Sequence, residues 1–355
     1  MLHLCVMPGP KFLTSSAPGA TVDALALMRH FRLATCALAA ASVSIGHAQQ
    51  PSFDAWLQDV RSAAIAAHIS GATVDAAFTG LTPLEPVIER DRSQPELTLD
   101  FRGYITRIVS PSRIEEGQRV FAEQRELLQR VGKRYGMPPE LLAAVWGIES
   151  NYGRTQGDFP VVAALATLGY DGRRGAMFRN ELLNALRILD QGHVGLDAMK
   201  GSWAGAMGQL QFMPSTFIGF AKDGDGDGRK DIWGSAADAL ESAANFMSPN
   251  WKPGLRWGRQ VTVPATFNMS LAGLGRTRTL AQWQALGVRL PGGQRLPREN
   301  VAASIIFADK DAREPAFLVY QNYRALLRWN RSNFFALAVG HLSDGIAGGA
   351  PLAGF

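Results

Sequence analysis

The chain has 355 residues, of which 46% are hydrophobic and 19% are charged, and its formal net charge is +5. This apolar fraction is enough for a sizeable core in one large domain or a few packed ones, and it argues against a mainly disordered chain. After residue 48 the chain carries 33 basic and 30 acidic side chains, a mild net charge of +3, and it has no long basic run. This charge therefore argues against nucleic acid as a partner and weakly favours a polyanionic surface, such as an envelope polymer.

Residues 28–50 have the pattern of an export signal. Arg29 and Arg32 precede an uncharged, alanine-rich run, and Gly46-His47-Ala48 places small residues where signal peptidase cuts. We therefore expect residues 1–48 to be a signal peptide with an upstream extension, for which a misassigned start codon is favoured over a genuine long n-region. No later run reaches the roughly 20 apolar residues that span a bilayer, so we expect no membrane span.

Both cysteines, Cys5 and Cys36, precede the predicted cut. The exported chain would therefore hold no disulfide, thiol nucleophile or zinc–thiolate site. Leu33-Ala34-Thr35-Cys36 is an imperfect lipoprotein box, because threonine precedes the cysteine and the apolar run follows it. The expected localisation is the periplasm, and outer-membrane association through a lipid stays open.

The exported part of the chain shows helical periodicity up to about residue 247. Gly136 is expected to end one helix, Pro138 and Pro139 to precede the next, and Ser235 to cap the last. Apolar residues recur at intervals of three and four in SFDAWLQDVRSAAIAAHI, IEEGQRVFAEQRELLQRVGKRYG, PPELLAAVWGIESNYG, RNELLNALRILDQG and AADALESAANFM.

The sequence pattern changes between about Trp251 and Arg313. There GRQVTVPATF, GVRLP and VAASIIFAD, separated by Gly and Pro, predict a small strand-containing insertion, after which helical periodicity returns in FLVYQNYRALLRWNRSNFFALAVGHLSDGIA. The expected fold class is mainly α, with an α+β element. Its expected parts are an N-terminal helical domain at 49–135, a central helical core at 136–250, a small β-containing subdomain at 251–313 and C-terminal helices at 314–355.

The segment LLAAVWGIESNYG, residues 141–153, contains one carboxylate. Glu149 follows eight uncharged residues, in a helix predicted at 139–150 that has hardly any polar face. Burial without a cationic partner disfavours the ionised form, so the pKa of Glu149 is expected to rise toward neutrality, as suits a general acid. This segment alone leaves an ordinary glutamate turned to solvent at a helix end as an equal alternative.

The segment GSWAGAMGQLQFMPSTF, residues 201–217, surrounds Gln209 and Gln211 with glycines and other small residues. Glycine allows a ligand to approach the backbone closely, and neutral groups such as those of Ser202 and Gln211 can hydrogen-bond hydroxyl and acetamido groups. Tight helix packing through small residues is the alternative. Either interpretation of this segment alone is weak.

Together these segments closely resemble the lytic murein transglycosylase B family. The E-S-x-Y-G-R stretch, ALATLGYDGRR, G-S-x-A-G-A-M-G-x-x-Q-F-M-P-S and RWNRSNFFALAV occur in the family's order, and DRSQPELTLDFRGYI is similar to its N-terminal part. The resemblance runs from about Phe53 to about Leu342. It implies a lysozyme-like catalytic core at 136–250, with the C-terminal helices completing a groove. It also implies cleavage of the β-1,4 bond between N-acetylmuramic acid and N-acetylglucosamine in peptidoglycan.

The resemblance assigns roles residue by residue. Glu149 matches the family's single catalytic acid/base, and Ser202 and Gln211 match residues that orient the glutamate and contact sugar. Trp329 and Phe335 stand where tyrosines are expected, so stacking can survive while hydroxyl hydrogen bonds are lost; Trp329 is kept as a substrate-binding residue and Phe335 is not. The other positions expected to line the glycan groove are Tyr104, Arg173, Arg174 and Asn330.

No second acid accompanies Glu149 in the glycan-binding motifs, although most glycosidases use two carboxylates. A one-carboxylate mechanism is coherent if protonated Glu149 donates to the leaving oxygen and the muramyl 2-acetamido group stabilises the cation at C1. Glu149 then takes the proton of the muramyl C6 hydroxyl as that oxygen attacks C1, which gives a 1,6-anhydromuramyl end. A hydrolytic muramidase and a non-catalytic peptidoglycan-binding protein remain as alternatives. The expected partners are glycan strands and proteins of the cell-wall machinery.

The segment DGDGDGRKDIWG, residues 223–234, has the start of an EF-hand-like calcium loop. Asp223, Asp225 and Asp227 occupy alternate positions, and Gly228 stands at the sixth. Three carboxylates this close repel one another unless a cation neutralises them. A solvated acidic turn is the alternative.

The second half of this loop departs from the EF-hand pattern. Arg229 is placed to offer its carbonyl at the seventh position and Asp231 lies at the ninth, but Gly234 stands at the twelfth, where glutamate belongs. The family resemblance implies a longer loop, 223–238, whose last acidic ligand is Asp238. We therefore expect a weakly bound Ca²⁺ with a structural role, and no organic cofactor.

Overall fold

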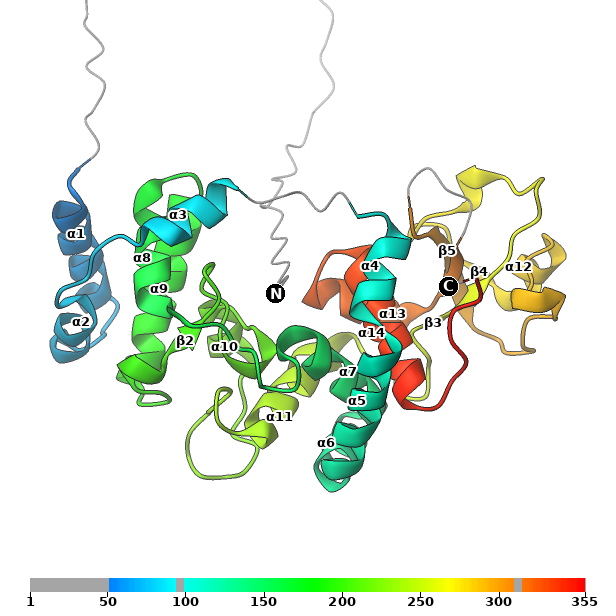
Figure 1. Cartoon of the computed structure of the whole chain (residues 1–355), viewed down its shortest axis with the longest axis horizontal. Helices are drawn as coiled ribbons and strands as arrows, with labels where there is room; N and C mark the ends of the chain where they lie inside the picture. Colours follow the sequence, from blue (N-terminus) through cyan, green and yellow to red (C-terminus); the bar gives the residue numbers. More distant parts are fainter. Residues whose placement is uncertain (1–50, 94–98, 310–314, 355) are drawn as a thin grey trace, which may run out of the picture.

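The structure, a computed structural model, describes residues 51–93, 99–309 and 315–354, and most of its elements are helices (Figure 1). The mainly α class predicted from periodicity is therefore confirmed. The predicted signal peptide at 1–48 and both cysteines lie outside the described residues. Within those three ranges, no helix combines the length and the apolar character needed to cross a bilayer.

The helices and strands follow one another in a simple order. The helices are α1 Phe53–Ala66, α2 Gly71–Phe78, α3 Glu85–Arg92, α4 Phe101–Ile108, α5 Pro111–Glu123, α6 Arg125–Tyr135, α7 Pro139–Ser150, α8 Val161–Asp171, α9 Gly175–Asp190, α10 Pro214–Phe220, α11 Ala236–Met247, α12 Leu280–Ala285, α13 Gln321–Trp329 and α14 Asn333–Ile346. The strands are β1 Phe159–Pro160, β2 Lys200–Gly201, β3 Gly258–Val261, β4 Arg278–Thr279, β5 Ala302–Phe307 and β6 Ala316–Val319.

The helix boundaries follow the start and stop residues of the sequence. Gly136 ends α6 in the left-handed conformation at φ 66, which glycine adopts without strain. The Ser235 hydroxyl accepts the backbone N–H of Asp238 and caps α11, as predicted. The segment that begins at Ile114 is divided by Gln124 into two helices, α5 and α6, where a single run was predicted.

Helix α7 is the buried centre of the helical body. It packs against α5, α6, α11 and α14, and its residues from Leu141 to Gly147 are buried. A helix enclosed on all sides has no use for a polar face, which explains the uncharged run before Glu149. The end of α7, which carries Glu149, therefore lies where the surrounding helices meet.

The β-containing subdomain is a four-stranded antiparallel sheet in the order β3-β6-β5-β4. It has a hydrophobic core of its own, in which Trp283 of α12 is fully buried and its indole N–H donates to the carbonyl of Ala303 at 2.9 Å. The prediction of a small strand-containing element is confirmed. In Figure 1 it forms one end of the molecule, beside α13 and α14.

The predicted boundary of this element at residue 313 is wrong. Residues 316–319, expected to begin a helix, form β6, which lies between β3 and β5 in the sheet. All four side chains of β6 are buried. A short apolar run buried on both faces has neither helical nor strand periodicity, so its pattern could not distinguish the two.

Candidate active site

Glu149 lies one residue before the end of α7 and is half-buried. Its Oε1 accepts a hydrogen bond of 2.7 Å from the indole Nε1 of Trp329, the last residue of α13. Burial of the carboxyl raises the pKa of Glu149 to about 8, and the hydrogen bond from Trp329 acts against this by lowering it. At neutral pH the group is therefore mostly protonated and able to donate a proton.

Trp329 is fixed by an aromatic cluster. Its ring lies 5.3 Å from that of Phe212 and 5.2 Å, edge-on, from that of Phe246, measured between centroids. The hydroxyl of the expected tyrosine is absent at this position, and the indole N–H of Trp329 supplies a different donor to Glu149, which the sequence did not predict. An indole N–H donates a hydrogen bond and cannot accept one. The Oε1 atom that faces it therefore presents a lone pair and not a proton.

Tyr104 of α4 belongs to the same neighbourhood. Its side chain is buried, and its pKa is raised by that burial and by the nearby charge of Glu149. Its ring lies 5.5 Å from that of Phe334 at the start of α14. The adjacent Phe335 is a buried core residue, which agrees with its omission from the predicted binding residues.

The glycine-rich segment is held against α7 by side-chain amides. Gln209 accepts the indole N–H of Trp146 at 2.8 Å and donates to the carbonyl of Trp233 at 3.1 Å. Gln211, at φ 51, donates through Nε2 to the carbonyls of Gln156 and Gly208, each at 2.9 Å. These contacts tie three loops to the end of α7, beside Glu149.

Ser202 is buried in the same segment, and its Oγ accepts the backbone N–H of Ala206 at 3.1 Å. The hydroxyl thus closes a tight turn, while the hydrogen bond to Glu149 comes from Trp329. An orienting role of Ser202 toward Glu149 stays a prediction. Asn330 follows Trp329, and its Oδ1 accepts the backbone N–H of Ser332 at 3.0 Å just before α14 begins.

Arg173 and Arg174 converge on one buried carboxylate, Asp91 of α3. Arg173 reaches both oxygens of Asp91, with Nε–Oδ2 and Nη2–Oδ1 distances of 2.9 Å, and Arg174 reaches Oδ1 at 2.7 Å. Such charge-assisted contacts fix the direction of both guanidinium groups. No role was predicted for Asp91, although it opens the quoted DRSQPELTLDFRGYI segment, because nothing local links it to arginines more than eighty residues later.

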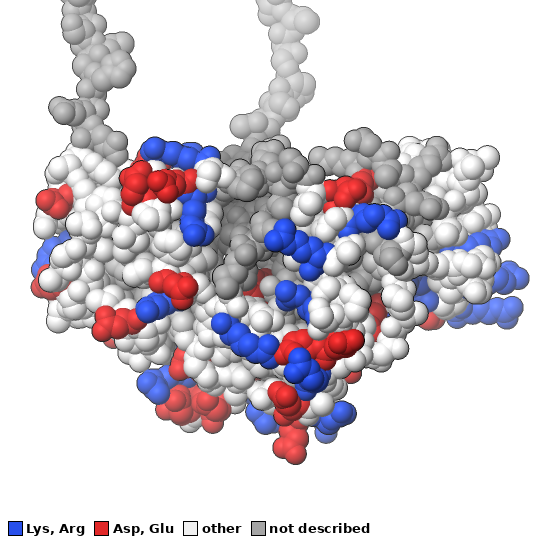
Figure 2. Space-filling view, viewed as in Figure 1, with Lys and Arg blue, Asp and Glu red and all other residues white. Residues whose placement is uncertain are grey.

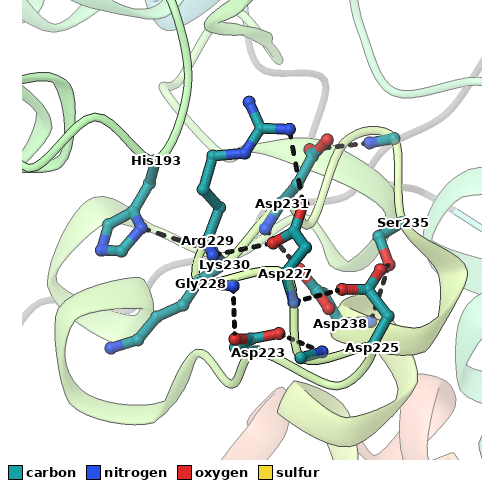
Figure 3. Close-up of polar contacts among 12 residues, drawn as sticks. His193, Asp223, Asp225, Asp227, Gly228, Arg229, Lys230, Asp231, Ser235 and Asp238 are labelled. Atoms are coloured by element: carbon teal, nitrogen blue, oxygen red, sulfur yellow. Dashed lines mark hydrogen bonds and ion pairs between the residues drawn. The ribbon is translucent and has the colours of Figure 1, made fainter.

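The acidic loop brings its first three predicted ligands together. One carboxylate oxygen each from Asp223, Asp225 and Asp227 lies within 4.8 Å of the other two, and all three side chains are exposed (Figure 3). Backbone N–H groups at Gly226 and Gly228 donate to Asp223 at 2.6 and 2.9 Å, which shapes the turn. Oxygen donors at this spacing suit a hard divalent cation such as Ca²⁺.

The later predicted ligands are used differently. Asp238 is buried and accepts the backbone N–H groups of Gly224 and Asp231, at 2.7 and 2.5 Å, so its carboxylate ties the two ends of the loop together. Asp231 accepts two backbone N–H groups of its own turn, and the Arg229 guanidinium pairs with Asp227 at 3.4 Å. The structure thus groups Asp223, Asp225 and Asp227 but does not bring Asp231 and Asp238 into that group.

A mainly helical core with a half-buried, proton-holding glutamate at the end of its central helix resembles the site of a lysozyme-like, glycan-cleaving enzyme. Residues 52–344 match the family model described as transglycosylase SLT domain, and the chain belongs to this family of lytic transglycosylases. The membrane-bound lytic murein transglycosylase B of Escherichia coli K12 is 30% identical over 249 residues, which are 69% of this chain and 66% of that protein's length.

Two solved structures support this assignment. SltB3 from Pseudomonas aeruginosa, in complex with NAG-NAM-pentapeptide, is 43% identical with a TM-score of 0.82, over 86% of this chain and 82% of that one. The lytic transglycosylase Slt35 from Escherichia coli, in complex with calcium, is 26% identical with a TM-score of 0.70, over 82% of this chain and 92% of that one.

The raised pKa of Glu149 predicts a pH-dependent gain in stability for Glu149→Gln. The folded protein keeps the proton up to about pH 8, whereas an unfolded glutamate releases it near pH 4.5, so the wild-type chain loses stability across this window. We expect the variant to gain roughly 2–4 kcal/mol of unfolding free energy above about pH 8 and almost nothing below about pH 4. Urea denaturation at a series of pH values measures this. Exposed Glu123→Gln is the control, and an equal gain at both ends of the series would contradict the prediction.

The hydrogen bond from Trp329 predicts a further shift. Because the indole N–H stabilises the ionised carboxyl, Trp329→Phe should raise the pKa of Glu149 by roughly one more unit, while Trp329→Tyr should restore part of the donor function. NMR titration of the glutamate carboxyl carbons measures this directly. An unchanged titration in the phenylalanine variant would show that the contact has no influence on the acid.

Proposed function

We propose that this chain is a lytic transglycosylase that cleaves the β-1,4 bond between N-acetylmuramic acid and N-acetylglucosamine in peptidoglycan. The observation that carries the proposal is the half-buried Glu149, whose pKa near 8 provides a proton at neutral pH. Family membership and the similarity to SltB3, a structure that contains a peptidoglycan fragment, support the substrate class. An exported, periplasmic location fits the predicted signal at residues 1–48.

The first step is proton donation from Glu149 to the glycosidic oxygen. Because Oε1 accepts the hydrogen bond from Trp329, the proton is carried by Oε2, which is the oxygen that faces the substrate in this proposal. As the bond to the leaving oxygen breaks, the muramyl 2-acetamido group stabilises the positive charge at C1. The resulting Glu149 carboxylate keeps the hydrogen bond from Trp329, which becomes stronger when the acceptor is charged.

The second step returns the proton to Glu149. The muramyl C6 hydroxyl attacks C1 and gives its proton to the carboxylate, which closes the 1,6-anhydro ring and consumes no water. A pKa near 8 suits both directions, because the group then loses and regains a proton at little cost near neutral pH. One carboxyl group therefore serves as acid and then as base.

The remaining predicted site residues are assigned to the glycan groove. The paired guanidinium groups of Arg173 and Arg174, oriented by Asp91, would bind anionic or carbonyl oxygens of the substrate. Tyr104 and Trp329 would contact sugar beside the acid. Ser202, Gln211 and Asn330 are kept as neutral hydrogen-bonding groups of the same groove.

The acidic loop is proposed as a structural Ca²⁺ site. Asp223, Asp225 and Asp227 would hold the ion through their carboxylates, and the ion would neutralise charges that otherwise repel one another. Asp238 would act indirectly, by holding the ends of the loop at a fixed distance. The relative Slt35 has been solved in complex with calcium, which supports the choice of ion.

The reaction is tested by digesting purified sacculi with the wild-type protein and with Glu149→Gln, and weighing the products by mass spectrometry. We expect ends lighter by one water for the wild type. We expect a loss of at least 10³-fold in rate for the glutamine variant, which keeps the size of the side chain but cannot donate the proton in the same way. Reducing ends would identify a hydrolytic muramidase, and undiminished turnover by the variant would refute Glu149 as the acid.

The ion is tested by thermal unfolding. Millimolar Ca²⁺ should raise the Tm by a few degrees, and EDTA should reverse this, because an ion that binds only the folded loop stabilises it by mass action. Asp225→Asn should reduce the response, whereas Asp59→Asn, an exposed change on α1, should not. Equal Tm values with calcium and with EDTA would mean that the loop is a solvated acidic turn.

A further inference from the structure

The sheet subdomain carries an excess of positive charge that the proposed chemistry does not use. Residues 251–300 contain eight Lys and Arg side chains and one acidic side chain, a formal charge of +7. Since the whole chain carries +5, all other residues together carry −2. The basic character of the protein is therefore concentrated in this one segment.

Part of this charge is exposed and unneutralised. Arg276, Arg295 and Arg298 lie in the loops around α12 and β4, and all three are exposed. Within residues 51–93, 99–309 and 315–354, none of them forms an ion pair or a side-chain hydrogen bond. By contrast, Arg256 and Arg259 in the same subdomain each pair with a carboxylate, at 3.3 and 3.6 Å.

The sheet subdomain lies at one end of the molecule, and α7, which carries Glu149, lies nearer the middle (Figure 1). Figure 2 shows Lys and Arg side chains close together at the end of the molecule formed by α12 and its flanking loops, where acidic side chains are few. We call the exposed loops of this subdomain that carry Arg276, Arg295 and Arg298 the arginine face.

The chemistry of the arginine face fits an extended polyanion. A guanidinium group binds a carboxylate through two parallel N–H bonds, and several on one surface attract a polymer that carries many such groups. A lipid bilayer is a poorer fit, because basic groups alone attach a protein to it weakly and stable binding adds an apolar surface that enters the membrane. Helix α12 instead turns Leu280 and Trp283 into the core of the subdomain.

We propose that the arginine face is a second binding surface for peptidoglycan, which takes the carboxylates of the stem peptides. This inference rests on the proposed function, because the polymer bound there is the substrate itself. A strand held at the arginine face raises the effective concentration of neighbouring glycan at Glu149 and slows the departure of the enzyme from the sacculus. The surface thus contributes to retention on an insoluble substrate and not to bond cleavage.

The test is co-sedimentation with purified sacculi, carried out on protein with the Glu149→Gln change so that the sacculi stay intact. Into this background we would introduce Arg276→Gln, Arg295→Gln and Arg298→Gln together. At about 50 mM salt the bound fraction should fall about fivefold, and the difference should shrink at about 0.5 M salt, where exposed charges are screened.

A matched variant removes the same amount of charge from another exposed surface. It carries Arg125→Gln, Arg130→Gln and Lys133→Gln, all on α6, and should bind sacculi as the parent does. Equal retention by both triple variants, or an equal loss in both, would overturn the proposal. An unchanged thermal unfolding curve for each variant shows that the comparison concerns binding and not folding.

Two further measurements separate the possible outcomes. Vesicles of phosphatidylglycerol and phosphatidylcholine should bind the parent weakly, and a loss of vesicle binding without a loss of sacculus binding in the arginine variant would assign the face to lipid instead. Turnover of short soluble glycans should be the same with and without the three arginines when Glu149 is intact. Failure of the unsubstituted protein to cleave any glycan would refute the proposed function, while the sacculus comparison would still decide the role of the arginine face.

Discussion

The hydrogen bond between Trp329 and Glu149 is the contact on which the arrangement of the site depends. It joins the end of α7 to the end of α13, two helices that belong to different parts of the chain. Burial alone would raise the pKa of the carboxyl so far that it could not release its proton. A carboxyl that is already ionised at neutral pH would have no proton to donate. The indole N–H moderates the effect of burial, so that the group keeps a proton near neutral pH and can still give it up.

The polar side chains that contact the loops following α7 and α10 serve mainly to hold backbone in place. Gln209 and Gln211 donate to loop carbonyls, and Asp238 accepts two backbone N–H groups. Loops cannot satisfy their own backbone groups as helices do, so side chains must supply the missing partners where the loops are buried. Amides and carboxylates therefore hold these loops in place, although the same residue types also bind ligands in other sites.

Local patterns predicted the parts of this molecule that local interactions build. Apolar periodicity predicted the helices of the body, and capping residues predicted where several of them begin or end. The uncharged run before Glu149 indicated a buried acid. The strand β6 was missed because a four-residue run buried on both faces carries no period. Asp91 and the donor role of Trp329 were missed for another reason: each acts on residues 82 or more positions away, and only the packed structure brings them together.

The connection from β6 to Trp329 bears on the stage of folding at which the site is completed. Strand β6 is the interior strand beside β3 and β5, and it leads through Tyr320 directly into α13, at whose end Trp329 stands. The acid and its donor are 180 positions apart in the chain. Contacts of such long range form late, after the intervening segment has been ordered. A chain that is still being synthesised thus has Glu149 without its partner, and the complete site belongs only to the fully folded protein.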